Sequence, residues 1–140
     1  MMHKVGSIPF KVFKDKFAIL FVTSQVRGRW ILPKGTLLEG ESHETACNRS
    51  TFEEAGVKGK LLKNFPITKL ITKSINNGTT LVPVTFYPLL VENQFDDWPD
   101  KGTRQRHWSL LRDVNKVASR EDYLNVLDDF KSFNSFILIK

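Results

Sequence analysis

The hydrophobic and polar positions of this chain predict a fold in which strands and helices are mixed. A short apolar, β-branched run over residues 17–23 is typical of a buried strand. Residues 57–91 are rich in Ile, Leu, Val and Thr, and Asn76-Asn77-Gly78 within them predicts a hairpin turn between two strands. Pro83 and Pro88 indicate that the second of these strands lies at an edge of the sheet or is bent.

One helix is expected in the first half of the chain, over residues 42–55. Glu41 or Ser42 is placed to cap its start, because a side-chain oxygen there can accept a hydrogen bond from a free backbone N–H group. Gly56 follows the last turn, where glycine commonly ends a helix in the left-handed conformation.

The second half of the chain is expected to hold a polar loop over residues 94–102, a strand over 104–110 and a helical segment over 111–118. A last helix is expected to begin near Ser119, the candidate cap, with Asp122 completing a weak capping pattern. Its apolar residues at helical spacing are Tyr123, Val126, Leu127, Phe130 and Phe133. That spacing predicts a face that packs on the body of the protein. The apolar residues 136–139 are placed either to enter the core or to form a dimer contact.

The order of these elements predicts an α+β fold, with a mixed sheet covered by helices on both faces, in a single domain over residues 1–140. Hydrophobic residues make up 41% and charged residues 26%, as in ordinary globular proteins. The single cysteine, Cys47, excludes a disulfide framework and a multi-cysteine zinc site. The longest apolar run, residues 17–22, is far shorter than the about 20 residues that span a bilayer, and residues 1–10 do not resemble a signal peptide. We therefore expect a cytoplasmic protein that does not enter a membrane.

The charge balance favours an anionic partner. Twenty-one basic and fifteen acidic residues give a formal net charge of +6. A nucleotide, another phosphorylated small molecule or a nucleic acid would suit this charge, although basic residues can also serve solubility alone. The hypothesis of an RNA-binding protein with little sequence preference is supported only by the net charge and the aromatic content, and we rank it last.

Two adjacent carboxylates, Glu53 and Glu54, stand in the last turn of the helix expected over residues 42–55. Negative charge at this end opposes the helix macrodipole, at a cost of about 0.3–1 kcal/mol for each exposed group. A divalent cation would remove that cost, since hard cations take carboxylate oxygens. A solvated acidic helix end, with Arg49 paired to Glu53, is the simpler interpretation of these residues alone.

The spacing of the whole segment 35–57 changes this interpretation. The segment reads Gly35-x5-Glu41-x7-Arg49-x3-Glu53-Glu54-x-Gly56-Val57. It resembles the signature of the Nudix hydrolases and matches seven of its nine specified positions in register. Shorter stretches, among them residues 29–35, Asp97-Trp98 and residues 104–108, resemble the branch that contains the diphosphoinositol polyphosphate phosphohydrolases.

The resemblance implies an α-β-α sandwich with a mixed, mainly antiparallel sheet. It also implies a phosphohydrolase that uses Mg2+ or Mn2+ to cleave a pyrophosphate bond in a nucleoside polyphosphate, a dinucleoside polyphosphate or a diphosphoinositol polyphosphate. The partner is then a phosphorylated small molecule rather than a nucleic acid, and the oligomeric state stays open.

The resemblance also assigns roles to single residues of the signature. Glu53 and Glu54 become metal ligands, together with the backbone carbonyl of Lys34. Arg49 and Glu41 become a pair that orients the helix face without reacting directly.

Ser50 is the most important departure from the signature, because the family has the first glutamate of an Arg-Glu pair at this position. A serine hydroxyl is uncharged and is a poor base at neutral pH. Either another carboxylate takes its place, with Asp97 as the first candidate, or the protein is slow, or it binds a phosphorylated ligand without hydrolysing it. Thr51 stands where the family has an aliphatic residue, which changes packing only.

Basic residues near the signature are candidates for phosphate binding, since guanidinium groups can contact two phosphate oxygens at once. The candidates are Lys34, Arg29, Arg27, Lys11, Arg104 and Arg106. Lys34 is the strongest of them because it adjoins Gly35 in the expected metal loop.

Overall fold

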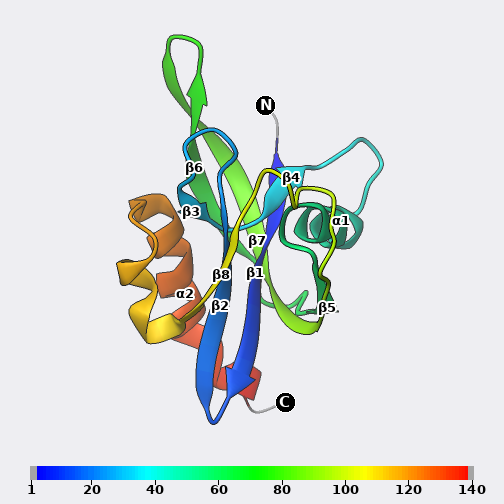
Figure 1. Cartoon of the computed structure of the whole chain (residues 1–140), viewed down its shortest axis with the longest axis vertical. Coiled ribbons are helices and arrows are strands. Elements are labelled where there is room, and N and C mark those ends of the chain that lie inside the picture. The colour runs from blue at the N-terminus through cyan, green and yellow to red at the C-terminus, as the bar shows by residue number, and fades with distance from the viewer. Residues whose placement is uncertain (1–2, 139–140) are drawn as a thin grey trace.

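The computed structural model describes residues 3–138, which build one mixed sheet with helices on both faces (Figure 1). The elements in chain order are β1 (Lys4–Phe13), β2 (Lys16–Thr23), β3 (Trp30–Ile31), β4 (Lys34–Thr36), α1 (His43–Ala55), β5 (Val57–Leu61), β6 (Ile67–Ile75), β7 (Gly78–Gln94), β8 (Arg106–Leu110), the 3-10 helix η1 (Leu111–Lys116) and α2 (Glu121–Leu138). The main strand order is β3-β2-β1-β7-β5, while β4 pairs with β1, β6 with β7 and β8 with β2. Among the strands of residues 3–138, only β1 and β7 pair in parallel, so the mixed, mainly antiparallel sheet is confirmed.

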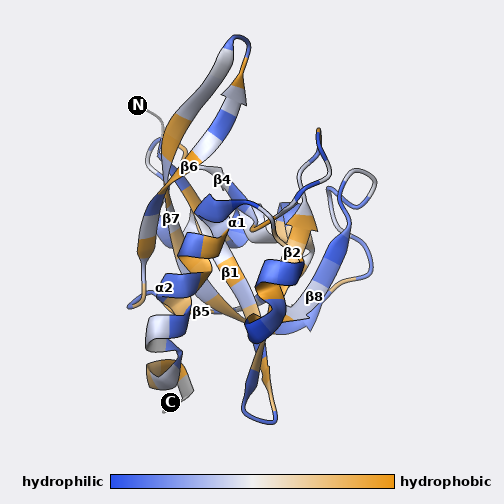
Figure 2. Cartoon of the chain, turned by 90° about the vertical axis from the view of Figure 1, so that its left-hand side faces the viewer, coloured by the Kyte–Doolittle hydropathy of each residue, from blue (hydrophilic) through white to orange (hydrophobic). Residues whose placement is uncertain are grey.

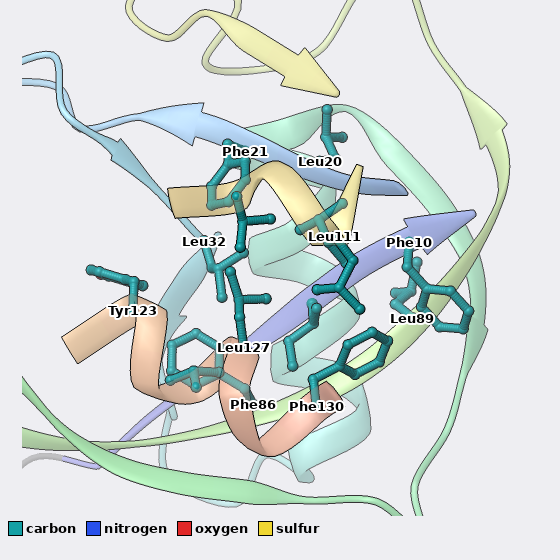
Figure 3. Packing of buried hydrophobic residues seen from close by; sticks show 14 of the residues in the cluster. Phe10, Leu20, Phe21, Leu32, Phe86, Leu89, Leu111, Tyr123, Leu127 and Phe130 are labelled. Atoms are coloured by element: carbon teal, nitrogen blue, oxygen red, sulfur yellow. The ribbon is translucent and has the colours of Figure 1, made fainter. Parts of the chain in front are cut away.

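The larger hydrophobic core lies between the sheet and α2 (Figure 3). Four apolar residues of α2 are completely buried, as their spacing predicts: Tyr123, Val126, Leu127 and Phe130. Phe10 and Phe17 reach Phe130 from the sheet, and the three ring centroids lie 5.5–5.6 Å from one another. Each fully buried side chain of this size stabilises the fold by about 1.5–3 kcal/mol relative to an exposed one. This packing fixes α2 across one face of the sheet.

Small side chains let α1 approach the opposite face closely. Ala46 and Cys47 pack against Val5 of β1 in a second, smaller cluster. The Cys47 thiol donates a hydrogen bond to the Gly6 carbonyl at 3.2 Å, and burial raises the pKa of this thiol to about 12. Cys47 is therefore a packing residue and not a nucleophile.

The ends of α1 form as the sequence predicts. Ser42, rather than Glu41, is the cap: its hydroxyl accepts a hydrogen bond from the Thr45 N–H at 3.1 Å. Gly56 is left-handed, with a φ of 66°, and its N–H donates to the Phe52 carbonyl at 2.9 Å. The last turn, which carries the paired glutamates, is thus held at a defined position.

The hydrophobic pattern does not predict β1 or β4. Gly6, Ser7 and Pro9 interrupt the apolar run of β1, yet this strand lies at the centre of the sheet between β2 and β7. Its residues are buried by strands that come later in the chain, so no local pattern reports their burial. The short strand β4, residues 34–36, exists only because it pairs with the start of β1.

Of the two alternatives that the prolines predict, an edge strand or a bent one, the edge strand is contradicted, because β7 pairs on both sides. Pro83 is tolerated because β1 pairing starts one residue later, at Val84. Pro88 lies where β7 changes partner, between the β6 pairing that ends at Phe86 and the β5 pairing that begins at Leu89. The long β6–β7 hairpin extends beyond the body of the protein (Figure 2).

Both helical segments expected in the second half are present. The segment expected over 111–118 is a 3-10 helix over Leu111–Lys116, and α2 begins at Glu121, two residues after Ser119. Asp122 does not complete a cap with Ser119. Its carboxylate instead accepts hydrogen bonds from the Thr72 N–H and the Arg120 guanidinium, which ties α2 to β6.

The chain end is partly described. Ile137 is buried in the core and Phe136 is exposed. The side chains of Phe133 and Leu138, and residue 139, lie outside the described residues. No helix of the described part is both long and apolar enough to cross a bilayer.

Candidate active site

Glu54 is the centre of the candidate site, on the last turn of α1. Its carboxylate accepts a hydrogen bond from the Lys34 backbone N–H at 3.0 Å and another from the Arg104 guanidinium at 2.9 Å. Burial raises the pKa of the Glu54 carboxyl, while the charges of Arg104 and Lys34 lower it. The fold thus holds one carboxylate in a fixed place, largely out of water and among cationic groups.

Arg104 holds this arrangement together. Besides Glu54, its guanidinium donates to the Asp100 carboxylate at 2.8 Å and to the Thr23 carbonyl at 3.0 Å. The side chain is only 9% exposed. Arg104 was predicted from the sequence to bind phosphate, but all three of its nitrogens contact protein groups, so in this structure it is a positioning residue.

Arg49 and Glu41 form the orienting pair that the sequence predicts. The guanidinium makes two hydrogen bonds to the carboxylate, at 2.8 and 3.0 Å, and a third to the Thr36 carbonyl. These bonds hold the pKa of Glu41 below its ordinary value. Glu53 lies 3.5 Å from the same guanidinium, with 45% of its side chain exposed. The pair closes the loop between β4 and α1 and leaves Glu53 accessible.

The Ser50 side chain points into the protein interior and not toward Glu54. Its side chain is buried, and its hydroxyl lies within hydrogen-bond distance of the Cys47 and Val5 carbonyls, at 3.3 and 3.5 Å. Gly35 of β4 packs directly on it: a Cβ added to Gly35 would lie 2.8 Å from the Ser50 Cβ. At the position of the missing glutamate, the chain therefore has a close contact between α1 and β4.

This contact predicts an energetic coupling between Gly35 and Ser50. Gly35→Ala should lower the free energy of unfolding by about 2 kcal/mol, because the new methyl group overpacks the contact. Ser50→Gly in the same chain removes the opposing Cβ, so the double variant should lose at least about 0.5 kcal/mol less than the sum of the single variants. Urea denaturation of the four proteins measures this coupling, and strictly additive losses would contradict the contact.

Cationic groups from distant parts of the chain lie around Lys34 and the Tyr123 ring. The Lys34 ammonium lies 5.5 Å from the centre of the Tyr123 ring, and the Arg120 guanidinium lies 4.8 Å from the same ring. Burial lowers the pKa of Lys34 to about 8; repulsion by Lys4 and other cations adds to this, and attraction to Glu54 opposes it. Sequence reasoning found Lys34 but missed Lys4 and Arg120, which no motif marks.

The lowered pKa of Lys34 predicts a dependence of stability on pH. Between pH 8 and 10.5 the unfolded chain binds a proton at Lys34 that the folded protein does not bind, so this group makes stability rise with pH. In Lys34→Met this contribution is absent. The free energy of unfolding of the wild type, relative to that of Lys34→Met, should therefore rise by about 2 kcal/mol from pH 7.5 to pH 10. Urea denaturation with EDTA present measures it, and a difference that does not change with pH would contradict the burial of this ammonium.

The other predicted phosphate ligands lie in varied surroundings. The Arg106 guanidinium donates to the Ala55 and Phe95 carbonyls and stacks on Trp98 at 3.8 Å, so it holds the end of α1. Lys11 is exposed and lies 5.2 Å from the Trp108 ring. The remaining two, Arg27 and Arg29, are exposed in the turn between β2 and β3.

A polar cavity of about 670 Å³ lies beside Arg104. Residues 23–28 line one side and residues 101–105 line the other. Hydroxyl and amide groups alternate there with the cations Arg27, Lys101 and Arg104, and no carboxylate belongs to the described lining. A cavity of this charge suits a ligand with several negative charges.

Asp100 is a carboxylate that the fold brings to the site and that the sequence does not predict. Asp97 is exposed and forms no hydrogen bond or ion pair with other residues between 3 and 138. Asp100 contacts Arg104, and its backbone N–H donates to the Glu53 carbonyl at 3.0 Å. The four-residue spacing of Asp100 and Arg104 is the only local sign of this role.

The donor set fits a divalent cation that is completed by substrate. Within residues 3–138, no three His, Cys, Asp or Glu side chains are grouped to bind a metal by themselves. Mg2+ usually takes one or two carboxylates and fills its other positions with water and substrate phosphates. Glu53 and Glu54 at the end of α1 are hard oxygen donors of this kind, and the Lys34 backbone, whose N–H contacts Glu54, would supply its carbonyl as a third.

Comparison with known proteins agrees with this arrangement. The model of the NUDIX domain family matches residues 3–130. Nudix hydrolase 21, chloroplastic, of Arabidopsis thaliana is 33% identical over 130 residues, which are 90% of this chain and 64% of the relative. Diphosphoinositol polyphosphate phosphohydrolase 3-beta of Bos taurus is 32% identical over 116 residues, which are 81% of this chain and 67% of the relative. This chain thus spans less than two thirds of the plant relative.

Solved structures share the fold at low sequence identity. An Ap4A hydrolase of C. elegans in a binary complex has a TM-score of 0.74 at 19% identity, covering 96% of this chain and 98% of that one. The NUDIX domain of Shewanella oneidensis NrtR, solved with ADP ribose, has a TM-score of 0.71 at 20% identity, covering 94% and 87%.

Proposed function

This chain belongs to the Nudix family, and we propose that it is a metal-dependent hydrolase that cleaves a pyrophosphate bond in a phosphorylated small molecule. The observation that carries the proposal is the fixation of Glu54 by the Lys34 N–H and the Arg104 guanidinium, with Glu53 beside it. This arrangement keeps an ionisable carboxylate at the position where the family signature places its metal ligands.

The proposed roles follow from the contacts of each residue. Glu53, Glu54 and the Lys34 carbonyl would hold Mg2+ or Mn2+, which when bound neutralises charge on phosphate oxygens and lowers the pKa of a water molecule. The Lys34 ammonium lies on the same side as Glu54 and attracts the anionic substrate. Arg104 and the pair of Arg49 and Glu41 keep the carboxylates and the loop in place.

We further propose a substrate with phosphate groups beyond the bond that is cleaved, such as a dinucleoside polyphosphate or a diphosphoinositol polyphosphate. The polar cavity beside Arg104 supports this, because its two exposed cations, Arg27 and Lys101, could bind phosphates away from Glu54. The names of the relatives support the same substrate class.

Ser50 does not prevent this function. It cannot act as the base, and its burial against Gly35 keeps it away from substrate. Activation of water then depends on the cation and the remaining carboxylates, so we expect hydrolysis that is strictly dependent on metal.

A substrate panel tests the proposal. The purified chain is incubated with diadenosine tetraphosphate, ADP-ribose and diphosphoinositol pentakisphosphate, each with Mg2+, Mn2+ or EDTA, and the products are separated. Hydrolysis of at least one compound with metal, and none with EDTA, is expected. No product from any compound, by protein whose folding is confirmed by circular dichroism, would contradict the proposal; calorimetry that shows binding without product would then favour a binding module.

A further inference from the structure

A second cavity lies at the end of the sheet away from Glu54. It has a volume of about 470 Å³ and lies between residues 15–17 of the β1–β2 turn, residues 110–112 at the start of η1, and Lys131 and Asn134 of α2. The strand β1 runs from the contact with β4 at Gly6 to this turn. From Gly6 to Phe13, at about 3.3 Å per residue, the strand places the two sites about 20 Å apart.

The floor of this cavity is apolar and rigid. Phe17 and Leu111 line it and are themselves almost fully buried. The Phe17 ring is held by Phe10 and Phe130, at centroid distances of 5.5 and 5.6 Å. The floor is therefore formed before any ligand binds, as is usual for small-molecule sites, which have volumes of about 300–1,000 Å³.

The rim carries an excess of positive charge. The lining includes three cationic side chains, Lys16, Arg112 and Lys131, and one carboxylate, that of Asp15. In the described part of the chain, Lys16 and Lys131 take part in no ion pair. Arg112 has only its neighbour Asp113, at 3.9 Å. An anion between these cations would relieve their mutual repulsion.

The turn that presents this rim has an unusual backbone. Lys14 and Asp15 are both left-handed, with φ of 48° and 65°, between the paired residues Phe13 and Lys16. Hairpin turns of this kind favour Asn, Asp or Gly at both positions. The chain keeps lysine at the first position, and the turn sets Lys16 beside the cavity.

We propose that this cavity binds an amphipathic anion. A carboxylate, sulfonate or phosphate head would contact the rim cations, and a short aliphatic or aromatic body would lie on Phe17 and Leu111. This site is separate from the proposed hydrolytic site and does not depend on that function.

Titration of the ¹⁵N-labelled full chain with octyl phosphate tests the proposal. Saturable shifts are expected in the amide signals of residues 15–17, 110–112 and 131–134. Octanol and inorganic phosphate should each bind at least about tenfold more weakly, because each lacks one of the two recognised parts. Shifts that do not saturate, or that cluster around Glu54 instead, would overturn the proposal.

Charge-reversal variants separate specific from general attraction. Lys16→Glu and Lys131→Glu should each weaken octyl phosphate binding at least about fivefold. Lys14→Glu changes the same charge in the same turn without lining the cavity, and it should leave binding unchanged. Equal weakening in all three variants, or binding to phosphatidylserine vesicles without any binding of soluble octyl phosphate, would overturn the proposal.

Discussion

Glu54→Gln should lower kcat/KM for pyrophosphate hydrolysis at least about a thousandfold, the loss typical when a group that stabilises the transition state through a metal is removed. Glutamine has the shape of glutamate and can still accept the Lys34 N–H hydrogen bond, but it lacks the negative charge that a cation requires. The measurement is steady-state hydrolysis of the best substrate of the panel at saturating Mg2+.

Glu44→Gln is the matched control for Glu54→Gln. Glu44 lies in the first turn of the same helix, with 49% of its side chain exposed and a long ion pair to Lys63 at 3.3 Å. An exposed pair contributes little, so this variant should keep both its activity and its stability. Equal activity of Glu54→Gln and the wild type would show that the carboxylate at this position has no part in the reaction.

Gly59→Ala should have the largest effect on stability, a loss of about 3 kcal/mol or more in the free energy of unfolding. Gly59 lies in β5 at a shift of register against β7. A Cβ there would lie 1.9 Å from the Leu90 carbonyl oxygen, and a paired backbone group cannot move aside. The β5–β7 pairing that follows α1 would have to open.

Gly102→Ala provides the comparison, because no atom lies within 4 Å of the added methyl group. Urea denaturation of both variants should show a change within about 0.5 kcal/mol for Gly102→Ala. If the two substitutions had equal effects, the close approach of β5 to β7 at Gly59 would be contradicted.

The parts of the fold that could be predicted are those whose stabilising contacts are local. The caps of α1 at Ser42 and Gly56 depend on hydrogen bonds within a few residues of each, and they form as expected. The strand β1 could not be predicted, because Ser7 and Pro9 are buried only when β7 and α1, which come later in the chain, pack against β1. The role of Asp122 could not be predicted, because it bonds to β6, which lies far away in the sequence.

The candidate site likewise has residues that the local sequence predicts and residues that only the packing of distant segments brings in. The spacing of the signature located Glu54 and Lys34, because it describes one continuous segment. Asp100 and Arg120 reach Glu54 or Lys34 only through the packing of a loop and of α2. The contact of Arg106 with the Ala55 carbonyl could not be predicted either, because nothing in its neighbourhood in the sequence reveals it.

The most direct test of the account is the location of a bound cation. Crystals soaked in Mn2+ and measured for anomalous scattering should show a peak within coordination distance of the Glu53 and Glu54 carboxylates and the Lys34 carbonyl, and the peak should be lost in Glu54→Gln. If the protein hydrolyses its substrate but its crystals, soaked in saturating Mn2+, show no peak near these oxygens, the proposed metal site is contradicted.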